Sequence, residues 1–169
     1  MPIQIYLGDL RDPFDTQATL QILSVYHESI VGNNGPLPEK VRETVIDGLL
    51  ACSNHRVFLA VDENVNGSEF RRAVGMAVCF VNYSTFRARS LINVHDLAVH
   101  PEYQRRGIGK MLLENVIRYA AENQHYAITL EVRKDNINAL KLYRKLRFAG
   151  VEENAKDEAM LFGKLVLLP

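Results

Sequence analysis

The segment Asp96 to Lys110 joins an apolar strand, a glycine loop and the start of an amphipathic helix. Gly107 and Gly109 let the backbone approach a ligand closely because they carry no Cβ atom. The first N–H groups of a helix have no partner within the helix, and the helix dipole favours negative charge at that end. The segment therefore predicts a pyrophosphate site over the N–H groups of Arg106 to Lys110.

The residues on either side favour this interpretation over an ordinary solvated helix start. Apolar residues recur at helical spacing after Gly107 and predict a helix of about five turns that packs on a sheet. The run Leu91 to Val99 predicts a strand buried on both faces. A triphosphate-binding Gly-x-x-x-x-Gly-Lys-Ser/Thr motif is absent, and the dinucleotide motif Gly-x-Gly-x-x-Gly fails at Leu112.

A second motif lies further along the chain. Residues Ala127 to Val132 alternate like a strand, and Asn136 to Leu146 then switch to helical spacing. This second motif thus has the same order of strand, turn and helix as the segment around Gly107 and Gly109.

At these two motifs the sequence resembles the GNAT superfamily of N-acetyltransferases. The family pattern Gln/Arg-x-x-Gly-x-Gly/Ala is matched by Gln104 to Gly109. Its second pattern, Asn-x-x-Ala-x-x-Leu-Tyr-x-x-x-Gly-Phe, is matched at Asn136, Ala139, Leu142, Tyr143 and Phe148. One departure is Arg147, which stands where the family usually has a glycine that caps the helix in a left-handed conformation.

The resemblance implies acetyl-CoA as the acyl donor and assigns cofactor-binding positions. The pyrophosphate would be held by Gln104, Arg105, Arg106, Gly107, Ile108, Gly109 and Lys110. The backbone of Leu97, Ala98 and Val99 would orient the thioester carbonyl, and Asn136 would bind an amide of the pantetheine arm. Asn136 is nearly as well explained as a helix cap.

Tyr143 is expected to be the general acid, because the family motif places a tyrosine hydroxyl near the sulfur of CoA. A phenol can donate the proton that the departing thiolate needs. From spacing alone, a core aromatic residue on one face of a helix would be the commoner explanation of Tyr143.

His95 and Asp96 are the candidates for the general base and its supporting residue. Side chains alternate across a strand, so the two are expected on opposite faces and not in one pocket. In the diamine acetyltransferase branch, which the chain also resembles at Tyr83 to Phe86, a glutamate stands at the position of His95 and an aspartate at that of Asp96. A histidine suits proton removal at neutral pH, while a structural role for His95 is about equally well supported.

Other reactive side chains show less pattern. Basic residues form two groups beside the expected cofactor cleft, namely Arg105, Arg106, Lys110, Arg144, Lys145 and Arg147. Some of them are expected to meet CoA phosphates, whereas the last three also fit a solvated helix end. The histidines lack the spacing of a metal site, so no metal is expected. Cys52 and Cys79 form no CxxC pair and are expected to be buried apolar residues.

Composition agrees with one globular enzyme domain covering residues 1–169. The chain has 47% hydrophobic and 24% charged residues, and 20 basic residues balance 20 acidic ones. This balance gives no field that would attract nucleic acid or an anionic membrane. No apolar run approaches the roughly 20 residues of a membrane span, and Met1 to Tyr6 lacks a signal-peptide pattern, so a cytoplasmic protein is expected.

The order of elements predicts an α/β fold. Strands are expected at 3–7, 57–61, 73–81, 91–99, 127–132 and 159–167, with a helix opened by Asp12-Pro13 and a second one that turns Val41, Val45, Ile46, Leu49 and Leu50 inward. This order corresponds to the GNAT-type mixed, mostly antiparallel twisted sheet with helices on both faces.

The sequence therefore predicts an acetyl-CoA-dependent N-acetyltransferase that acts on a primary amine of a small molecule. A protein or peptide amine and an antibiotic amine are compatible acceptors, and a homodimer stays open. A module that senses acyl-CoA without turnover is the competing class, and an interaction protein on the same fold is a third. Acceptor choice is expected to reside in the loop Gly32 to Pro38, its two flanking helices and the hairpin Asn82 to Ser90.

Overall fold

The computed structural model describes residues 3–29, 32–63, 71–151 and 160–167. Its elements in chain order are β1 (Ile3–Leu7), α1 (Pro13–Glu28), α2 (Glu39–Ala51), β2 (His55–Asp62), β3 (Arg72–Ser84), β4 (Arg89–Val99), the 3-10 turn η1 (Pro101–Tyr103), α3 (Ile108–Glu122), β5 (Ala127–Arg133), α4 (Ile137–Lys145) and β6 (Met160–Val166). The strands form one sheet in the order β1-β2-β3-β4-β5-β6.

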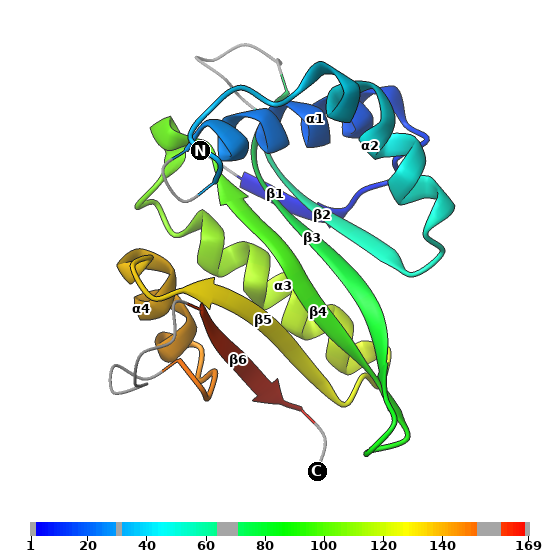
Figure 1. Ribbon diagram of the computed structural model, residues 1–169, viewed down its shortest axis with the longest axis vertical. Coiled ribbons are helices and arrows are strands. Elements are labelled where there is room, and N and C mark those ends of the chain that lie inside the picture. Colours follow the sequence, from blue (N-terminus) through cyan, green and yellow to red (C-terminus); the bar gives the residue numbers. More distant parts are fainter. Residues whose placement is uncertain (1–2, 30–31, 64–70, 152–159, 168–169) are drawn as a thin grey trace.

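Every neighbouring pair in this sheet is antiparallel except β4 and β5, which are parallel. The parallel pair is short, because only Ile92 to Val94 lie opposite Ile128 to Leu130. Beyond this contact β4 and β5 diverge toward their carboxyl ends, as Figure 1 shows. The expected fold, a mostly antiparallel mixed sheet with helices on both faces, is confirmed.

Two apolar cores lie on opposite faces of the sheet. The α3-side core contains Leu112 and Val116 of α3 and Leu140 of α4, packed on β4 and β5. The α1-side core contains Ala18 and Ile22 of α1, packed on β2 and β3. Figure 1 shows α1 and α2 across the upper half of the sheet and α3 crossing behind β4 and β5.

Local signals explain where the first helix begins. The carboxylate of Asp12 accepts hydrogen bonds from the N–H groups of Phe14 and Asp15, and Pro13 occupies the first helical position. A side-chain cap and a proline at this position both favour helix initiation. The expected start at Asp12-Pro13 is thus confirmed.

Three burial expectations were wrong. In α2 no residue is fully buried and Val41 is exposed, although Ile46, Leu49 and Leu50 pack against the α1-side core as expected. In β4 the side chain of His95 is exposed, so the strand is not buried on both faces throughout. Cys52 is exposed at the end of α2, because the helix ends there and the chain turns toward β2, whereas Cys79 is buried as expected. The end of the polar turn after Asp62 and the start of the last expected strand lie outside the described residues.

Candidate active site

A cleft of about 640 Å³ lies beside the carboxyl end of β4, where the predicted phosphate loop (Gln104 to Lys110), the first turns of α3 and α4, and α1 meet. Residues from both sequence motifs line it. Ten of the predicted cofactor-binding residues are among them: Leu97, Ala98, Val99, Gln104, Arg105, Gly107, Ile108, Gly109, Lys110 and Asn136. The side chains of the remaining two, Arg106 and Tyr143, are not among the described lining residues.

The phosphate loop contains two residues with left-handed backbone. Arg105 has a φ of 64° and Gly107, which starts α3, has a φ of 83°. Gly107 provides no side-chain cap for the first turn of α3. Loops of this kind turn successive N–H groups toward one concave surface, which is suited to an anion. The side-chain amide of Gln104 donates to the carbonyl of Val99 across 3.1 Å and so ties the loop back to β4.

Gly109 lies beside residues of both β4 and α4. A Cβ atom at this position would lie 3.4 Å from Cδ2 of Leu142 and 3.8 Å from Cγ2 of Val99. These are ordinary contact distances, so a methyl group fits while a longer side chain would extend toward the cleft or displace its wall.

Asn136 has a structural role at the start of α4. Its side-chain oxygen accepts a hydrogen bond from the N–H of Ala139 across 3.2 Å, so the helix-cap interpretation is confirmed. Asn136 also lines the cleft. Its contact with the pantetheine arm therefore stays a prediction. The helix cap is compatible with this contact.

Tyr143 is buried, with 6% of its surface exposed, and belongs to the α3-side core. Its ring centroid lies 5.8 Å from that of Phe148. Burial raises the pKa of the Tyr143 phenol well above its usual range, so the hydroxyl keeps its proton at neutral pH. The ring packs as a core aromatic would, and the role of the hydroxyl as an acid stays a prediction.

A β-bulge in β4 changes the geometry expected for the candidate base. Asp96 lies opposite Val78 of β3, but the next pair joins Val94 to Cys79, so His95 is an extra residue in β4. A bulge inserts one residue and breaks the alternation of side chains. The expectation that His95 and Asp96 point to opposite faces was therefore wrong.

The surrounding residues place both side chains on the α1 side of the sheet. The His95 ring lies edge-on to Phe80 with centroids 5.6 Å apart, and Phe80 packs against the α1-side core. Asp96 is paired with Val78, which belongs to the same core. Leu97 then packs on the α3 side and Ala98 on the α1 side, so regular alternation resumes after the bulge.

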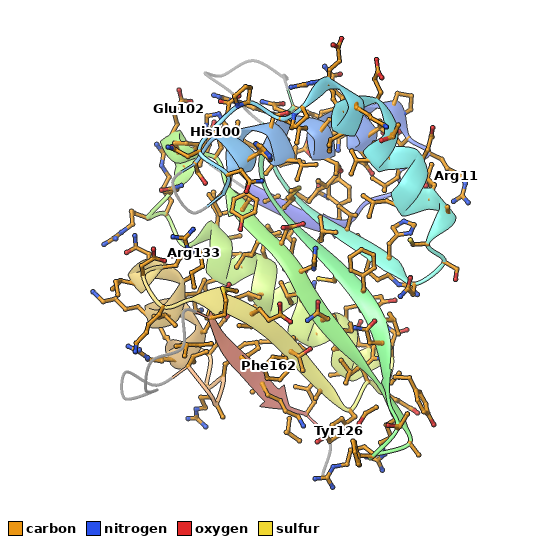
Figure 2. The ribbon with its side chains drawn as sticks, in the orientation of Figure 1. Arg11, His100, Glu102, Tyr126, Arg133 and Phe162 are labelled. Atoms are coloured by element: carbon orange, nitrogen blue, oxygen red, sulfur yellow. The ribbon has the colours of Figure 1, made fainter. Side chains whose placement is uncertain are left out.

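Tyr26 of α1 also belongs to this site, because it interacts electrostatically with Asp96. Burial raises the pKa of Asp96, and the neighbouring His95 opposes this shift. Burial and the charge of Asp96 raise the pKa of Tyr26, while Arg133 at the end of β5 lowers it. Figure 2 shows Arg133 at the end of β5 that diverges from β4.

Sequence reasoning missed Tyr26, although its side chain lines the cleft. The available signal was its position four residues after Ile22, on the same face of a helix that packs on the sheet. No motif distinguishes such a tyrosine from an ordinary core aromatic residue.

The predicted basic side chains differ in their positions and contacts. Arg105, Lys110 and Lys145 line the cleft. The guanidinium of Arg106 lies over the ring of Tyr103, 4.9 Å from its centroid, and that of Arg144 donates to the carbonyl of Val151 across 2.7 Å. Only part of the expected basic clusters therefore reaches the cleft in the described structure.

Arg147 adopts the backbone conformation that the family glycine predicts. Its φ is 64°, in the left-handed region, directly after α4. The turn thus keeps its geometry although the residue carries a side chain.

Within the described ranges, no group of three or more His, Cys, Asp and Glu side chains could hold a metal ion. Likewise, none of the described helices is long and apolar enough to cross a membrane.

Comparisons with known proteins agree on the type of protein. The model described as the acetyltransferase (GNAT) family matches residues 20–148. An uncharacterised N-acetyltransferase of Methanocaldococcus jannaschii is 32% identical over 85 residues, which are 50% of this chain and 36% of that protein. The N-alpha-acetyltransferase RimI of Mycobacterium tuberculosis is 47% identical over 58 residues, 34% of this chain and 35% of that protein. The chain thus spans about a third of the length of these two curated relatives.

Among solved structures, a chain of the NatC complex bound to Gag peptide and CoA has a TM-score of 0.72. The match covers 99% of both chains at 21% sequence identity. At this level of identity the likeness concerns the fold.

Proposed function

Because the chain belongs to the acetyltransferase (GNAT) family, we propose that it transfers the acetyl group of acetyl-CoA to a primary amine, with the reaction at the carboxyl end of β4. The observation that carries this proposal is the bulge at His95. It brings the imidazole of His95 and the carboxyl group of Asp96 to one face of the sheet, beside the strand residues that line the cleft.

In the proposed reaction, the amine nitrogen attacks the thioester carbonyl and the carbon–sulfur bond breaks. The amine loses a proton, and the CoA thiolate gains one. An aliphatic amine is mostly protonated at neutral pH, so a base next to the acceptor accelerates the first step. The chain must also hold the donor, for which Gly107 and Gly109 leave the loop backbone accessible.

His95 and Asp96 are the proposed proton acceptors. His95 is exposed on the α1 side of the sheet, where an acceptor can reach it, while Asp96 is partly buried beside it. Arg133 and Tyr26 complete this region from β5 and α1. Tyr143 is the proposed acid for the thiolate, in keeping with a phenol that remains protonated.

The sequence predicts a small-molecule amine as the acceptor, and this stays a prediction, as does the likeness to the diamine acetyltransferases. A second candidate acceptor is the α-amino group of a peptide. It is supported by the name of the RimI relative and by the peptide bound in the NatC complex. It is also supported by the sheet surface beyond His95, where Glu131 is exposed and Phe162 is 55% exposed.

A turnover screen tests the proposal. Acetyl-CoA is incubated with the protein and with panels of polyamines, aminoglycosides, amino acids and peptides with different N-terminal residues, and released thiol is measured. We expect release that depends on one of these acceptor classes, together with an acetylated product detected by mass spectrometry. CoA binding without turnover on any panel would instead favour a sensor.

A further inference from the structure

The phosphate loop rests on a buried contact between two distant parts of the chain. Tyr103, the last residue of η1, is 6% exposed, and its hydroxyl donates to a carboxylate oxygen of Asp62 across 3.1 Å. Asp62 is fully buried at the end of β2. The loop begins at Gln104, directly after this tyrosine. The contact therefore fixes the chain at the point where it enters the loop.

A second set of contacts holds the same turn from β3. The guanidinium of Arg72 lies 2.9 Å from a carboxylate oxygen of Glu102 and donates to Nε2 of His100 across 3.2 Å. It also lies over the ring of Tyr103, 5.5 Å from the centroid. Figure 2 shows His100 and Glu102 together at the carboxyl end of β4. We call Asp62, Arg72, His100, Glu102 and Tyr103 the Tyr103 cluster.

The ring of Tyr103 also contacts the loop itself. Arg106 lies over it with its guanidinium 4.9 Å from the centroid, and Tyr103 lines the cofactor cleft. One ring is thus in contact with two arginines, one from the sheet and one from the loop. Such cation–π contacts are stronger where water is excluded.

The loop needs support of this kind. Arg105 holds a left-handed φ of 64°, which is unfavourable for a residue with a Cβ atom and persists only where the surrounding structure enforces it. A buried carboxylate such as Asp62 is also costly unless it is paired or hydrogen-bonded. The hydroxyl of Tyr103 contributes to both requirements, because it bonds to the carboxylate and holds the start of the loop.

We propose that Tyr103 is a positioning residue, which Asp62 and Arg72 hold so that the phosphate loop keeps the conformation that binds CoA. The proposal rests on the proposed function, in which this loop binds the pyrophosphate. Tyr103 acts through the backbone of the loop and takes part in no bond-making step. Its removal should therefore weaken CoA binding and leave the chemical step intact.

The test is Tyr103→Phe, which keeps the ring and removes the hydrogen bond to Asp62. We expect the Kd for CoA, measured by calorimetry, to rise on the order of 10-fold, the usual effect of losing a hydrogen bond to a charged group. With the acceptor found by the turnover screen, kcat at saturating acetyl-CoA should match that of the wild type. Asp62→Asn keeps an oxygen that can accept from Tyr103 and should raise the Kd less.

The matched control is Tyr126→Phe. Tyr126 is also a buried tyrosine, and its hydroxyl accepts from Nζ of Lys164 across 2.8 Å. Figure 2 shows it at the opposite end of the molecule from His100 and Glu102. This variant should lose a comparable hydrogen bond and still bind CoA like the wild type.

An unchanged Kd in Tyr103→Phe, or an equal rise in Tyr126→Phe, would overturn the proposal. So would a fall in kcat at saturating acetyl-CoA without a change in Kd. If Tyr103→Phe does not fold, Arg72→Gln, which removes the contacts to Glu102 and His100, carries the same expectations. A wild-type protein that binds no CoA would instead refute the proposed function, and the inference with it.

Discussion

The guanidinium of Arg105 donates a hydrogen bond to the side-chain oxygen of Asn138 across 3.0 Å. The two residues come from different sequence motifs, the predicted phosphate loop and the first turn of α4, and both line the cleft. This bond joins the two motifs into one wall. It also turns the Arg105 side chain toward α4, while the left-handed backbone of Arg105 shapes the loop.

Tyr143→Phe tests whether the buried phenol supplies a proton. If the hydroxyl protonates the thiolate, turnover should fall on the order of 10²–10⁴-fold, the usual contribution of a positioned acid, while acetyl-CoA binding stays nearly unchanged. Because burial raises the pKa of Tyr143, the wild-type acid should stay protonated from pH 6 to 9 and the loss should persist across this range.

Tyr119→Phe is the matched control, since the hydroxyl of Tyr119 accepts from Nε of Arg56 across 2.6 Å and its side chain is not among the described residues lining the cleft. It should keep full activity. Full activity of Tyr143→Phe over the same pH range would show that Tyr143 is structural.

Asp96→Asn should make the protein more stable and less active. Burial raises the pKa of Asp96 in the folded state, so the folded protein holds this proton more tightly than the unfolded chain. The contribution of Asp96 to stability is then present below the unfolded pKa and lost as pH rises through the folded pKa. At pH 7 the charged group therefore destabilises the fold, and asparagine removes this effect.

Denaturant unfolding at pH 7 and below the ordinary Asp pKa of about 4 checks this sign. The increase in the free energy of unfolding from Asp96→Asn should be present at pH 7 and vanish at the lower pH. The rate should fall on the order of 10²-fold if Asp96 is the base. His95→Gln serves as the comparison, because this exposed side chain should affect stability little. Loss of rate only in His95→Gln would assign the base to His95.

Arg147→Gly should stabilise the protein. The left-handed φ of 64° is unfavourable for arginine by about 1–2 kcal/mol. Against this gain, glycine lowers the free energy of unfolding by about 0.5–1 kcal/mol, because it has greater freedom in the unfolded chain. We therefore expect a gain of about 0.5–1 kcal/mol in the free energy of unfolding.

Gly150→Ala, close to Arg147 in the chain, should have the opposite effect on stability. Gly150 has a φ of 84°, and a Cβ atom there would lie 2.2 Å from the carbonyl oxygen of Phe162. The free energy of unfolding of this variant should fall by on the order of 2 kcal/mol, because the backbone strain and the clash cannot both be relieved. A destabilised Arg147→Gly would show that the Arg147 side chain makes contacts that outweigh its backbone strain.

The parts of the site that could be predicted are those with local signals. The glycines of the predicted phosphate loop, the Asp12 cap of α1 and the Asn136 cap of α4 each act over a few residues, and the sequence indicated each of these positions. The turn at Arg147 could not be predicted in the same way, because arginine replaces the glycine that favours a left-handed conformation there, yet the chain retains this conformation.

The remaining features depend on contacts between distant segments. The bulge at His95 arises from the register between β3 and β4, which the sequence of β4 alone does not specify. Tyr26 joins the site only because α1 lies over the end of β4. Asp62 and Tyr103 are 41 positions apart, so the Tyr103 cluster has no local signature.

The most direct test of the account is calorimetric binding of acetyl-CoA to the wild type and to Gly109→Glu. The glutamate would bring a side chain and a negative charge to the cleft wall beside Leu142, against the phosphates. Gly48→Glu is the control, since Gly48 lies exposed in α2 with no atom near its Cβ position. We predict that the wild type and Gly48→Glu bind alike, and that Gly109→Glu remains folded by circular dichroism but shows no binding. Unchanged binding by Gly109→Glu would contradict the assignment of this loop as the pyrophosphate site.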